Sequence, residues 1–463
     1  MEGIQKDTGF PCKKKDNIIQ DKLNQRDKLK VLFLGHCSYY HVQNIAALLK
    51  DNLDFLHIAG ANMIRPDGKE VTDHELGSFD EFVKLPRKRT IEVSPREIAR
   101  EFTKSLSDKS SRGVLIRDIL SLRIKHAKKY LSAMAEERKF SSLMKEALSN
   151  YDAFHFHYLG AEMLVPLKYI GKNKIVILHV WGSDLLNDAG VESYKAQYEA
   201  IQRADFVIIN TIEMTQYFLA KFGREFISKI RNAYFVIDNE MMDRIANADS
   251  AMLRKKFVER YGIDESKIII EAGYNASIWQ KHLEIIEQLN MLSEDLKAKI
   301  HVVIPMTYGL SDKSGKYLSK VKKAAEESTF SSTVIDSYIT TDEVLELIVS
   351  TEVKLNLRET DNLNTAMLES YCSDTIAVNG AWMPYGALRR IGIYYREIES
   401  MKHLKNEMEF LLRNLKSERE KTADNRKIVR DFFDNSRVAS DWINLYEEVN
   451  NRANEKRIAN ETT

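Results

Sequence analysis

Short apolar segments, each followed by a segment of helical length and spacing, constrain the fold of this 463-residue chain most strongly. A strand that is apolar along its whole length is buried on both faces, which is typical of a parallel sheet covered by helices on both sides. The first series predicts a helix at 41–50 and strands at 30–35, 53–60, 153–159, 174–180, 205–210 and 233–237. This alternation predicts an α/β domain of the doubly wound type.

A charged stretch with helical spacing, 238–262, interrupts the pattern before a second series begins. The second series predicts strands at 267–273, 299–306, 332–338, 352–358 and 374–380. We therefore predict two Rossmann-like domains facing across a cleft, with a boundary near 238–250. The predicted parts are a mobile polar arm at 1–27, an N-terminal domain at 28–238 with a basic helical insert at 61–150, a C-terminal domain at 251–430, and a final helix and tail at 431–463.

Composition narrows the class of protein. The formal net charge of +1 gives no overall reason to expect nucleic acid as a partner. The cysteines, Cys12, Cys37 and Cys372, are far apart and lack metal-ligand spacing, which favours a reducing compartment. No signal peptide and no membrane span are expected, so we predict a cytoplasmic protein that can still contact a membrane surface.

Polar and aromatic residues lie at the ends of two neighbouring predicted strands. Ligands bind beyond the carboxyl ends of such strands, so we expect these side chains to face the cleft: His155 and His157 near the end of one strand, and His179, Trp181, Ser183 and Asp184 where the next strand ends. An alternative is a capped turn in which Gly182 bends the chain and Trp181 only packs. The two histidines at 155 and 157 suit zinc, but no clear third and fourth ligands accompany them, and no metal is predicted.

The segment RETDNLNTAMLESY (358–371) places Asp361 and Glu369 eight residues apart, with a helix between them. The first amides of a helix are free donors that suit a diphosphate, and an acid two turns later can bind a ribose diol. The alternative is an aspartate cap followed by an unrelated surface glutamate.

A third candidate is EAGYNASIWQKH (271–282), where Gly273 ends a strand and Lys281 enters a helix. A cation here can neutralise a diphosphate leaving group, although Lys281 can equally lie in solvent. The sequence has no P-loop, no G-x-G-x-x-G and no G-x-S-x-G, which counts against kinases, ordinary nicotinamide dehydrogenases and serine hydrolases.

The insert is strongly basic, with 14 Lys and Arg against 5 Asp and Glu from Lys84 to Lys129. Within it, 113–131 combines apolar and basic residues at helical spacing, which predicts a basic amphipathic helix able to bind an anionic membrane. A core-packed helix with a solvated basic face is the alternative. Few aromatic residues accompany the charge, so nucleic acid is not expected.

These segments resemble a known family. VILHVWGSDLL (176–186) resembles the H-x-W-G-S-D element of glycosyltransferases with the two-domain GT-B fold. RETDNLNTAMLES (358–370) resembles the E-x7-E segment of the large retaining group, carbohydrate-enzyme family four, with Asp361 and Glu369 in the acid positions. EAGYNASIWQKH followed by KIHVVIPMTYG (299–309) is similar to the second domain of the bacterial lipid-linked 4-acetamido-4,6-dideoxygalactose transferases. The similarity covers most of 28–395 in order and spacing.

The resemblance implies a metal-independent hexosyltransferase without a cofactor, which moves a sugar from a nucleotide-diphosphate donor to a hydroxyl in cell-envelope or surface-polysaccharide synthesis. It implies that the C-terminal domain binds the donor, that the N-terminal domain binds a sugar or lipid-linked acceptor, and that the helix around Trp442 crosses back to the first domain. Glu369 is expected to hold the ribose and Asp361 the transferred sugar. The remaining donor-side candidates are Gly273, Lys281, Arg358, Asn362, Leu363, Asn364 and Thr365. The acceptor-side candidates are the five residues His155, His157, His179, Trp181 and Ser183.

The chain also departs from the family pattern. The first acid is Asp361 instead of Glu, Asn362 replaces the glycine that often follows, and the loop 35–41 lacks a glycine pair. One of the two groups retains the anomeric configuration and the other inverts it. Inversion requires a base, for which Asp184 and His36 are the candidates, whereas retention requires none. A non-catalytic GT-B scaffold and a nucleotide-sugar 2-epimerase remain alternatives.

Overall fold

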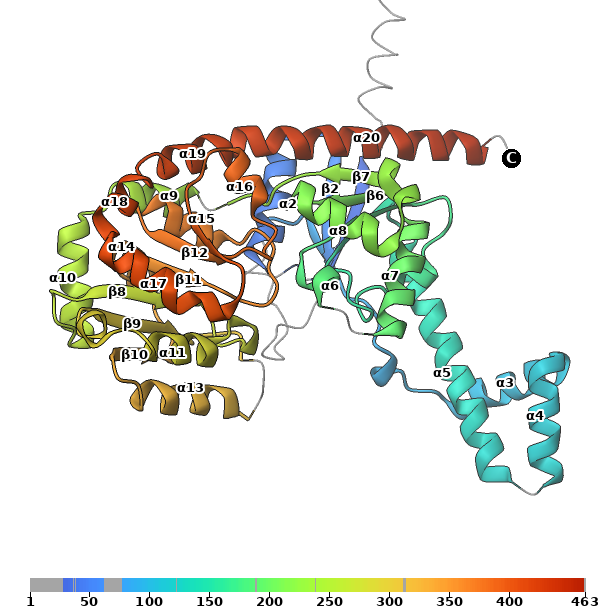
Figure 1. Ribbon diagram of the computed structural model, residues 1–463. Helices are drawn as coiled ribbons and strands as arrows, with labels where there is room; N and C mark the ends of the chain where they lie inside the picture. Colours follow the sequence, from blue (N-terminus) through green and yellow to red (C-terminus); the bar gives the residue numbers. More distant parts are fainter. Residues whose placement is uncertain are drawn as a thin grey trace, which may run out of the picture.

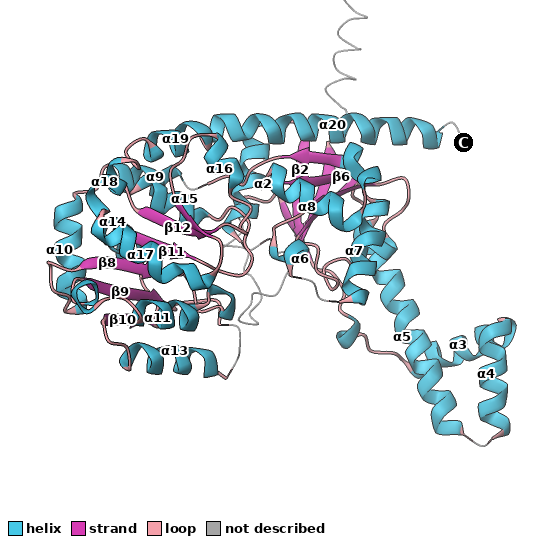
Figure 2. Cartoon of the chain, viewed as in Figure 1, coloured by secondary structure: helices cyan, strands magenta, loops and turns pink. Residues whose placement is uncertain are grey.

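The computed structural model describes residues 28–35, 37, 39–61, 77–121, 123–187, 190–237, 239–310 and 314–461. These residues form two lobes, each built on one parallel sheet with helices on both faces (Figures 1 and 2). The predicted N-terminal arm at 1–27 and the candidate base His36 lie outside the described residues.

The first lobe contains a seven-stranded sheet in the order β3-β2-β1-β4-β5-β6-β7. Every strand pair in it is parallel, as the continuously apolar segments predict. The strands are β1 (Leu29–Leu34), β2 (Leu56–Ala61), β3 (Glu81–Val83), β4 (Ala153–His157), β5 (Ile175–His179), β6 (Phe206–Ile209) and β7 (Ile230–Asn232). The helices are α2 (Tyr40–Asn52), α3 (Pro95–Ser107), α4 (Lys109–Leu120), α5 (Ile124–Leu148), α6 (Ser183–Leu186), α7 (Val191–Arg203) and α8 (Ile212–Phe222), with short 3-10 helices η2 (Lys88–Thr90), η3 (Val165–Tyr169) and η4 (Arg224–Lys229).

The last helix, α20 (Asn435–Glu461), belongs to the core of the first lobe although it follows the second lobe in sequence (Figure 1). Its buried side chains, including Trp442 and Tyr446, pack with α2 on one face of the sheet. The Trp442 indole N–H donates a hydrogen bond of 2.8 Å to the carbonyl oxygen of Tyr234. The opposite face is covered by α7, α8 and the end of α5. The predicted helix that crosses back is confirmed.

The second lobe contains a six-stranded sheet in the order β10-β9-β8-β11-β12-β13. Its strands are β8 (Ile268–Ala272), β9 (Ile300–Pro305), β10 (Ser331–Ile335), β11 (Val353–Asn356), β12 (Ile376–Gly380) and β13 (Arg396–Ile398). Its helices are α9 (Asn239–Ala246), α10 (Ser250–Tyr261), α11 (His282–Asn290), α12 (Glu294–Lys297), α13 (Lys316–Glu326), α14 (Thr341–Ser350), α15 (Thr365–Cys372), α16 (Gly386–Arg390), α17 (Leu404–Arg413), α18 (Leu415–Glu420) and α19 (Asn425–Phe432), with η5 (Ile278–Gln280) and η6 (Met401–His403). Side chains of α11, α13 and α17 pack on one face, and those of α9, α14 and α15 on the other.

One predicted strand differs from the structure. The predicted strand at 233–237 is wrong, because the edge strand is β7 and the residues after it run to the second lobe without pairing. These residues are apolar because they pack in the interior: Val236 and Ile237 are buried. The carbonyl oxygen of Tyr234 accepts a hydrogen bond from Trp442 of α20 in place of a strand partner. The segment 239–246, for which the sequence predicts helical spacing near a domain boundary, is the helix α9, and its Met241, Met242 and Ile245 pack in the core of the second lobe.

The predicted single helix at 113–131 is also wrong, because the chain turns between α4 and α5. The Arg123 N–H donates to the carbonyl oxygen of Asp118 at 2.8 Å, and the Asp118 carboxylate contacts Nδ1 of His126 across the turn. These contacts stabilise a reversal of the chain between α4 and α5. The connecting residues include no Gly or Pro, so nothing in the sequence indicates a turn there. Among the described residues, no helix is long and apolar enough to cross a membrane.

Candidate functional site between the lobes

Asp184 lies where β5 ends, and backbone donors surround its carboxylate. Its oxygens accept hydrogen bonds from the N–H groups of Gly182 at 2.8 Å, Leu159 at 2.9 Å and Trp181 at 3.0 Å. Burial raises the pKa of Asp184, and these backbone donors oppose that rise. The carboxylate therefore fixes the loops after β4 and β5, and this geometry favours a positioning role over the predicted role of catalytic base.

Gly182 brings this loop against the second lobe. Its φ is +117°, and a Cβ at this position would lie 2.6 Å from Cβ of Asn362. The Asn362 amide donates to the carbonyl oxygen of Trp181 at 3.3 Å. Only a glycine allows both the backbone conformation and this approach. The H-x-W-G-S-D element and the predicted donor loop therefore meet directly.

Two further hydrogen bonds join the lobes around this point. The Tyr40 hydroxyl donates to Oγ1 of Thr365 at 2.8 Å, and the Thr360 hydroxyl donates to Oδ1 of Asn187 at 2.7 Å. Thr365 is the first residue of α15, so the start of that helix faces the first lobe. The structure thus places the predicted acceptor and donor elements on opposite sides of one junction.

The three predicted histidines do come together, but in the interior. His155, His157 and His179 are fully buried, and each offers a ligand atom within 4.8 Å of the others. His155 Nδ1 lies 2.8 Å from the Tyr446 hydroxyl of α20. Burial lowers the pKa of His179 to about 3 and that of His155 well below its ordinary value, so these imidazoles are neutral.

The orientation of these rings argues against an ion between them. The rings of His155 and His157 stack with centroids 4.0 Å apart and an angle of 28° between their planes. A metal lies in the plane of each imidazole that binds it, so two stacked rings must rotate before they share one. His179 lies edge to face with Trp181 at 6.3 Å. His157 and His179 therefore pack against the ring of Trp181. Because all three histidines are buried, they do not make the predicted direct contact with an acceptor.

The remaining acceptor-side candidates lie closer to the junction. Trp181 is half-buried among Tyr39, Tyr158 and Phe235. Ser183 begins α6, and its hydroxyl lies 3.5 Å from that of Tyr158. Tyr158 has a positive φ of 78°, an uncommon conformation for a residue with a side chain. Tyr158 was not among the sequence candidates, although it directly follows the His155–His157 pair.

On the second lobe, Asp361 organises the loop before α15. Its Oδ2 accepts from the Tyr385 hydroxyl at 3.1 Å and from the Asn364 amide, and its Oδ1 accepts from the Asn362 N–H at 2.9 Å. Burial raises the pKa of Asp361, which the nearby Arg358 guanidinium opposes. Tyr385 is a site residue that the sequence does not reveal, because 29 residues separate it in sequence from its other partner, Asn356.

The predicted row of free amides is shorter in the structure. The Asn362 N–H donates to Asp361, and the Leu363 N–H donates to the Asn362 side chain at 2.9 Å. Asn364 caps α15 by accepting from the N–H of Met367 at 2.9 Å. Two of the predicted anion-binding amides, those of Asn362 and Leu363, are therefore already engaged within the loop.

Both predicted cations converge on this loop and both contact acids. Arg358 Nη1 lies 3.3 Å from Asp361, and its guanidinium lies over the ring of Tyr274. Lys281 Nζ lies 3.0 Å from Glu359, and this contact raises the pKa of Lys281. Each cation is therefore charged and held beside the loop before α15.

Gly273 lets the chain after β8 pass close to these groups. Its φ is +71°, and a Cβ would lie 2.8 Å from Nε2 of His282 and 3.0 Å from Oε1 of Gln280. The next residues, Tyr274 and Asn275, face the loop after β9, where Gly309 approaches Asn275. The predicted place of Gly273 at a strand end is correct. Because it has no side chain, the backbone can pass close to His282 and Gln280.

Glu369 lies one turn into α15 and is half-buried. Burial raises the pKa of Tyr308 and the charge of Glu369 adds to the rise, so the two side chains are close enough to interact. Tyr308 follows β9, where the sequence predicts a strand but no site residue. Its place in the MTYG segment, beyond a strand end, is the signal that would have found it.

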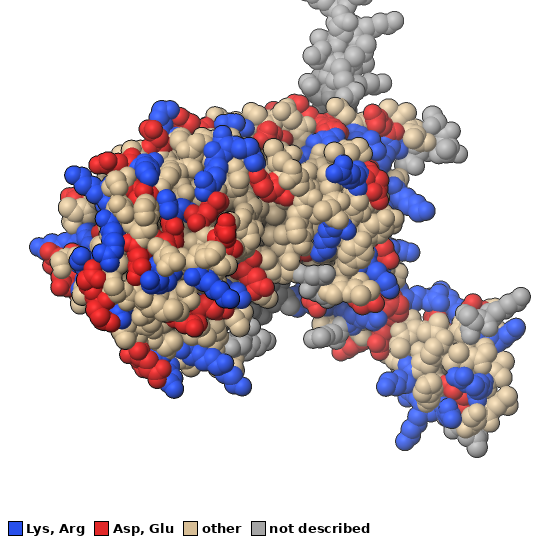
Figure 3. Space-filling view, in the orientation of Figure 1, with Lys and Arg blue, Asp and Glu red and all other residues tan. Residues whose placement is uncertain are grey.

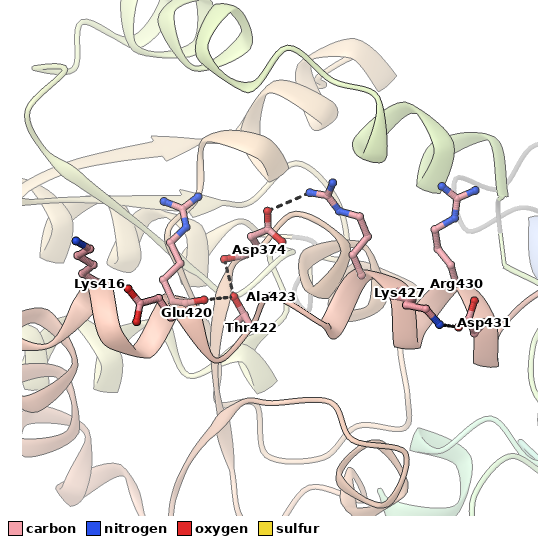
Figure 4. A pocket seen from close by; sticks show the side chains of 10 residues that line it. Asp374, Lys416, Glu420, Thr422, Ala423, Lys427, Arg430 and Asp431 are labelled. Carbon is pink, nitrogen blue, oxygen red and sulfur yellow. Dashed lines mark hydrogen bonds and ion pairs between the residues drawn. The ribbon is translucent and has the colours of Figure 1, made fainter.

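A separate hollow of about 810 Å³ lies away from this junction, beside α18 and α19 (Figure 4). Its lining includes Asp374, which follows the end of α15 opposite the donor loop. Arg426 pairs with Asp374, Lys427 with Asp431, and Arg430 with Asp243. Acids thus neutralise much of its basic lining, and we assign it no part in donor binding.

By sequence, no protein-family model and no curated protein matches this chain. By structure, it is similar to Anabaena Alr3699/HepE in complex with UDP and glucose, with a TM-score of 0.63, 11% identity, and coverage of 91% of this chain and 100% of that one. A glycosyltransferase from Rickettsia africae ESF-5 gives a TM-score of 0.62 at 12% identity over 92% of this chain and 99% of that one. Sucrose-phosphate synthase from Thermosynechococcus elongatus gives 0.63 at 10% identity over 91% and 99%. The predicted fold class, two Rossmann-like lobes in the GT-B arrangement, is confirmed.

Proposed function

We propose that this chain, which has the GT-B fold, is a glycosyltransferase that moves a sugar from a nucleotide-diphosphate donor to a hydroxyl acceptor. Alr3699/HepE was crystallised with UDP and with UDP-glucose, which supports a nucleotide-sugar donor here. We further propose that the transfer needs no metal and serves the synthesis of a cell-envelope or surface glycoconjugate.

The observation that carries the proposal is the junction at which Gly182 meets Asn362. The acids Asp361 and Glu369, the start of α15, and two cations lie on the second-lobe side, and Trp181 lies on the first. A nucleotide diphosphate requires hydrogen-bond acceptors for its sugar and positive charge for its phosphates. This part of the second lobe supplies both.

In the proposed donor complex, Lys281 and Arg358 exchange their present acidic partners for phosphate oxygens. Lys281 is held by Glu359 at 3.0 Å and Arg358 by Asp361 at 3.3 Å, distances at which a diphosphate can compete for the same charges. Glu369 accepts hydrogen bonds from the ribose diol, with Tyr308 beside it. Asp361 keeps Asn364 and Tyr385 in place at the transferred sugar.

In the reaction, the bond from the sugar C1 to the diphosphate oxygen breaks, and a bond from C1 to the acceptor oxygen forms. In a retaining transfer the departing phosphate accepts the acceptor proton. An inverting transfer needs a protein base, and both oxygens of Asp184 already accept from backbone N–H groups. This engagement favours the retaining course among the described residues.

The test is thermal unfolding of the full chain with UDP, dTDP, GDP and the corresponding sugar nucleotides. We expect one nucleotide diphosphate to raise the Tm, and we expect Glu369→Ala to remove that rise. Glu287→Ala is the matched control, because Glu287 is an exposed glutamate on α11. Absence of a shift with every nucleotide would contradict the proposal. Conversion of the sugar nucleotide to its epimer without any acceptor, detected by proton NMR because epimers have equal masses, would favour an epimerase.

A further inference from the structure

The insert forms a helical arm, here α3, α4 and the first part of α5 (95–139), that projects away from both lobes (Figure 1). Only the later part of α5 joins the core of the first lobe, through Phe140, Met144 and Leu148. The nucleotide site and the crossing helix α20 lie elsewhere. The described contacts therefore give the arm no part in the fold of the lobes beyond the root of α5.

The arm buries charged side chains and exposes large apolar ones, the reverse of an ordinary helical unit. Its own apolar cluster contains Leu115, Ala127 and Leu131. The interior also holds Glu101, paired with Arg138 at 2.7 Å, and Asp118, which contacts His126. The outward-facing apolar side chains are more numerous than the cluster: Phe102, Leu106, Ile116, Ile119, Leu120 and Ile124. A helical unit that exposes more large apolar side chains than it buries is built to be covered.

The apolar exposure is greatest at the tip of the arm, the turn between α4 and α5. Ile119 is 43% exposed, Leu120 is 79% exposed and Ile124 is 67% exposed. The turn between α4 and α5, which Asp118 and Arg123 stabilise, lies at the far end of the projection (Figure 1). Three branched aliphatic side chains at the end of a projecting hairpin can enter a bilayer interface without moving the lobes.

The charge around this tip is of one sign. From 112 to 129 the chain carries Arg112, Arg117, Arg123, Lys125, Lys128 and Lys129, all of them exposed, and one acid, Asp118. Asp118 is only 1% exposed and contacts His126. Figure 3 shows blue Lys and Arg side chains around the arm, next to the tan surface of uncharged residues. Cations beside exposed aliphatic side chains match an anionic headgroup layer above hydrocarbon.

We propose that the helical arm docks the protein on an anionic lipid bilayer, with Ile119, Leu120 and Ile124 entering the interface and the surrounding Lys and Arg contacting the headgroups. The charge complementarity selects a lipid surface over an apolar protein groove, for which a ring of like charges would be unfavourable. Resting on the proposed glycosyl transfer, docking places the acceptor lobe beside a lipid-linked acceptor.

The experiment is sedimentation of the full chain with phosphatidylcholine vesicles and with vesicles containing 30% phosphatidylglycerol, at low and high salt. We expect binding to the anionic vesicles alone, weakened by salt. Arg123→Gln/Lys125→Gln/Lys128→Gln should lower the partition coefficient about 100-fold, from the attraction of each cation to the anionic surface. Ile119→Ser/Leu120→Ser/Ile124→Ser should lower it at least tenfold.

The matched control variants make substitutions of the same kind at exposed positions outside the arm. Val191→Ser/Ile212→Ser/Ile227→Ser removes three side chains of the first lobe that are 70%, 55% and 62% exposed. Lys172→Gln/Lys256→Gln/Lys320→Gln removes three exposed charges outside the arm. Both controls should bind vesicles like the parent chain.

The proposal is overturned if the parent chain binds neither vesicle, or if the tip variants bind as well as their controls. A dimer in analytical ultracentrifugation that the apolar tip variant abolishes would instead make the tip a contact between copies, and would also overturn it. Nucleotide-induced stabilisation, measured in the same samples without vesicles, reports on the transferase proposal separately.

Discussion

Replacing Gly182 with alanine tests how the two lobes meet. The new Cβ would lie 2.6 Å from Cβ of Asn362 and 3.3 Å from its backbone nitrogen. Carbon atoms in contact lie about 3.5–4.0 Å apart, so the loops must separate by about 1 Å. Asn362 cannot turn aside, because its Cβ is fixed by the backbone of a buried loop.

The separation should weaken two hydrogen bonds between the lobes, Tyr40 to Thr365 at 2.8 Å and Thr360 to Asn187 at 2.7 Å. Each bond contributes about 1 kcal/mol, so losing both makes the closed arrangement of the lobes less stable by about 2 kcal/mol. The equilibrium constant for closure then falls roughly 30-fold. The positive φ of +117° adds about 1–3 kcal/mol of backbone strain for alanine. We expect a larger radius of gyration and a lower Tm.

Small-angle scattering, with and without UDP, measures the closure of the lobes, and a thermal melt measures the loss of stability from strain. Gly190→Ala is the matched control, because Gly190 also has a positive φ of 88°, while a Cβ there would meet no heavy atom of the described residues within 4 Å. The control should lose stability from strain while keeping the scattering profile. If both variants scatter alike, Gly182 does not hold the lobes together and the reasoning is refuted.

Three further predictions concern the first lobe. Asp184→Asn turns an amide donor toward backbone N–H groups and should lower the free energy of unfolding by about 2–3 kcal/mol in urea titrations, whereas Glu287→Gln, on an exposed helix face, should not change it. Trp442→Ala should lower it by about 3–5 kcal/mol, because it empties a fully buried site and removes the bond from α20 to Tyr234; an unchanged urea midpoint would contradict the role of α20. His179 binds a proton near pH 6.5 when unfolded but only near pH 3 when folded, so stability should fall as the pH drops below about 6.5, by up to about 1.4 kcal/mol per pH unit, and the slope of Tm against pH should shrink in His179→Asn.

Buried histidines also bear on how the first lobe is built. His155, His157 and His179 occupy strand ends, where the sequence places polar residues at the cleft. The structure covers them with Trp442, Tyr446 and Phe235, which come from distant parts of the chain. A strand end is open to solvent only if nothing else packs there, and that condition depends on where α20 lies.

The sequence by itself determined the two parallel sheets. Strands such as 174–180 and 299–306 are apolar on both faces, and such strands are stable only between two layers of helices. It also determined that Asp361 and Glu369 flank a helix start, because Asn364 is a strong cap and the spacing is local. The sequence did not predict the edge strands β3 and β13, because a strand of three residues is too short to show a recognisable periodicity.

Only the tertiary structure decided what each polar residue does. Asp184 becomes a loop anchor because three backbone N–H groups point at it, and Lys281 lies beside the loop before α15 because Glu359 lies 3.0 Å away. Gly182 matters because of Asn362, which is 180 residues away in sequence. Periodicity and capping are properties of neighbours in the chain, whereas burial, hydrogen bonding and close approach depend on groups that folding alone brings together.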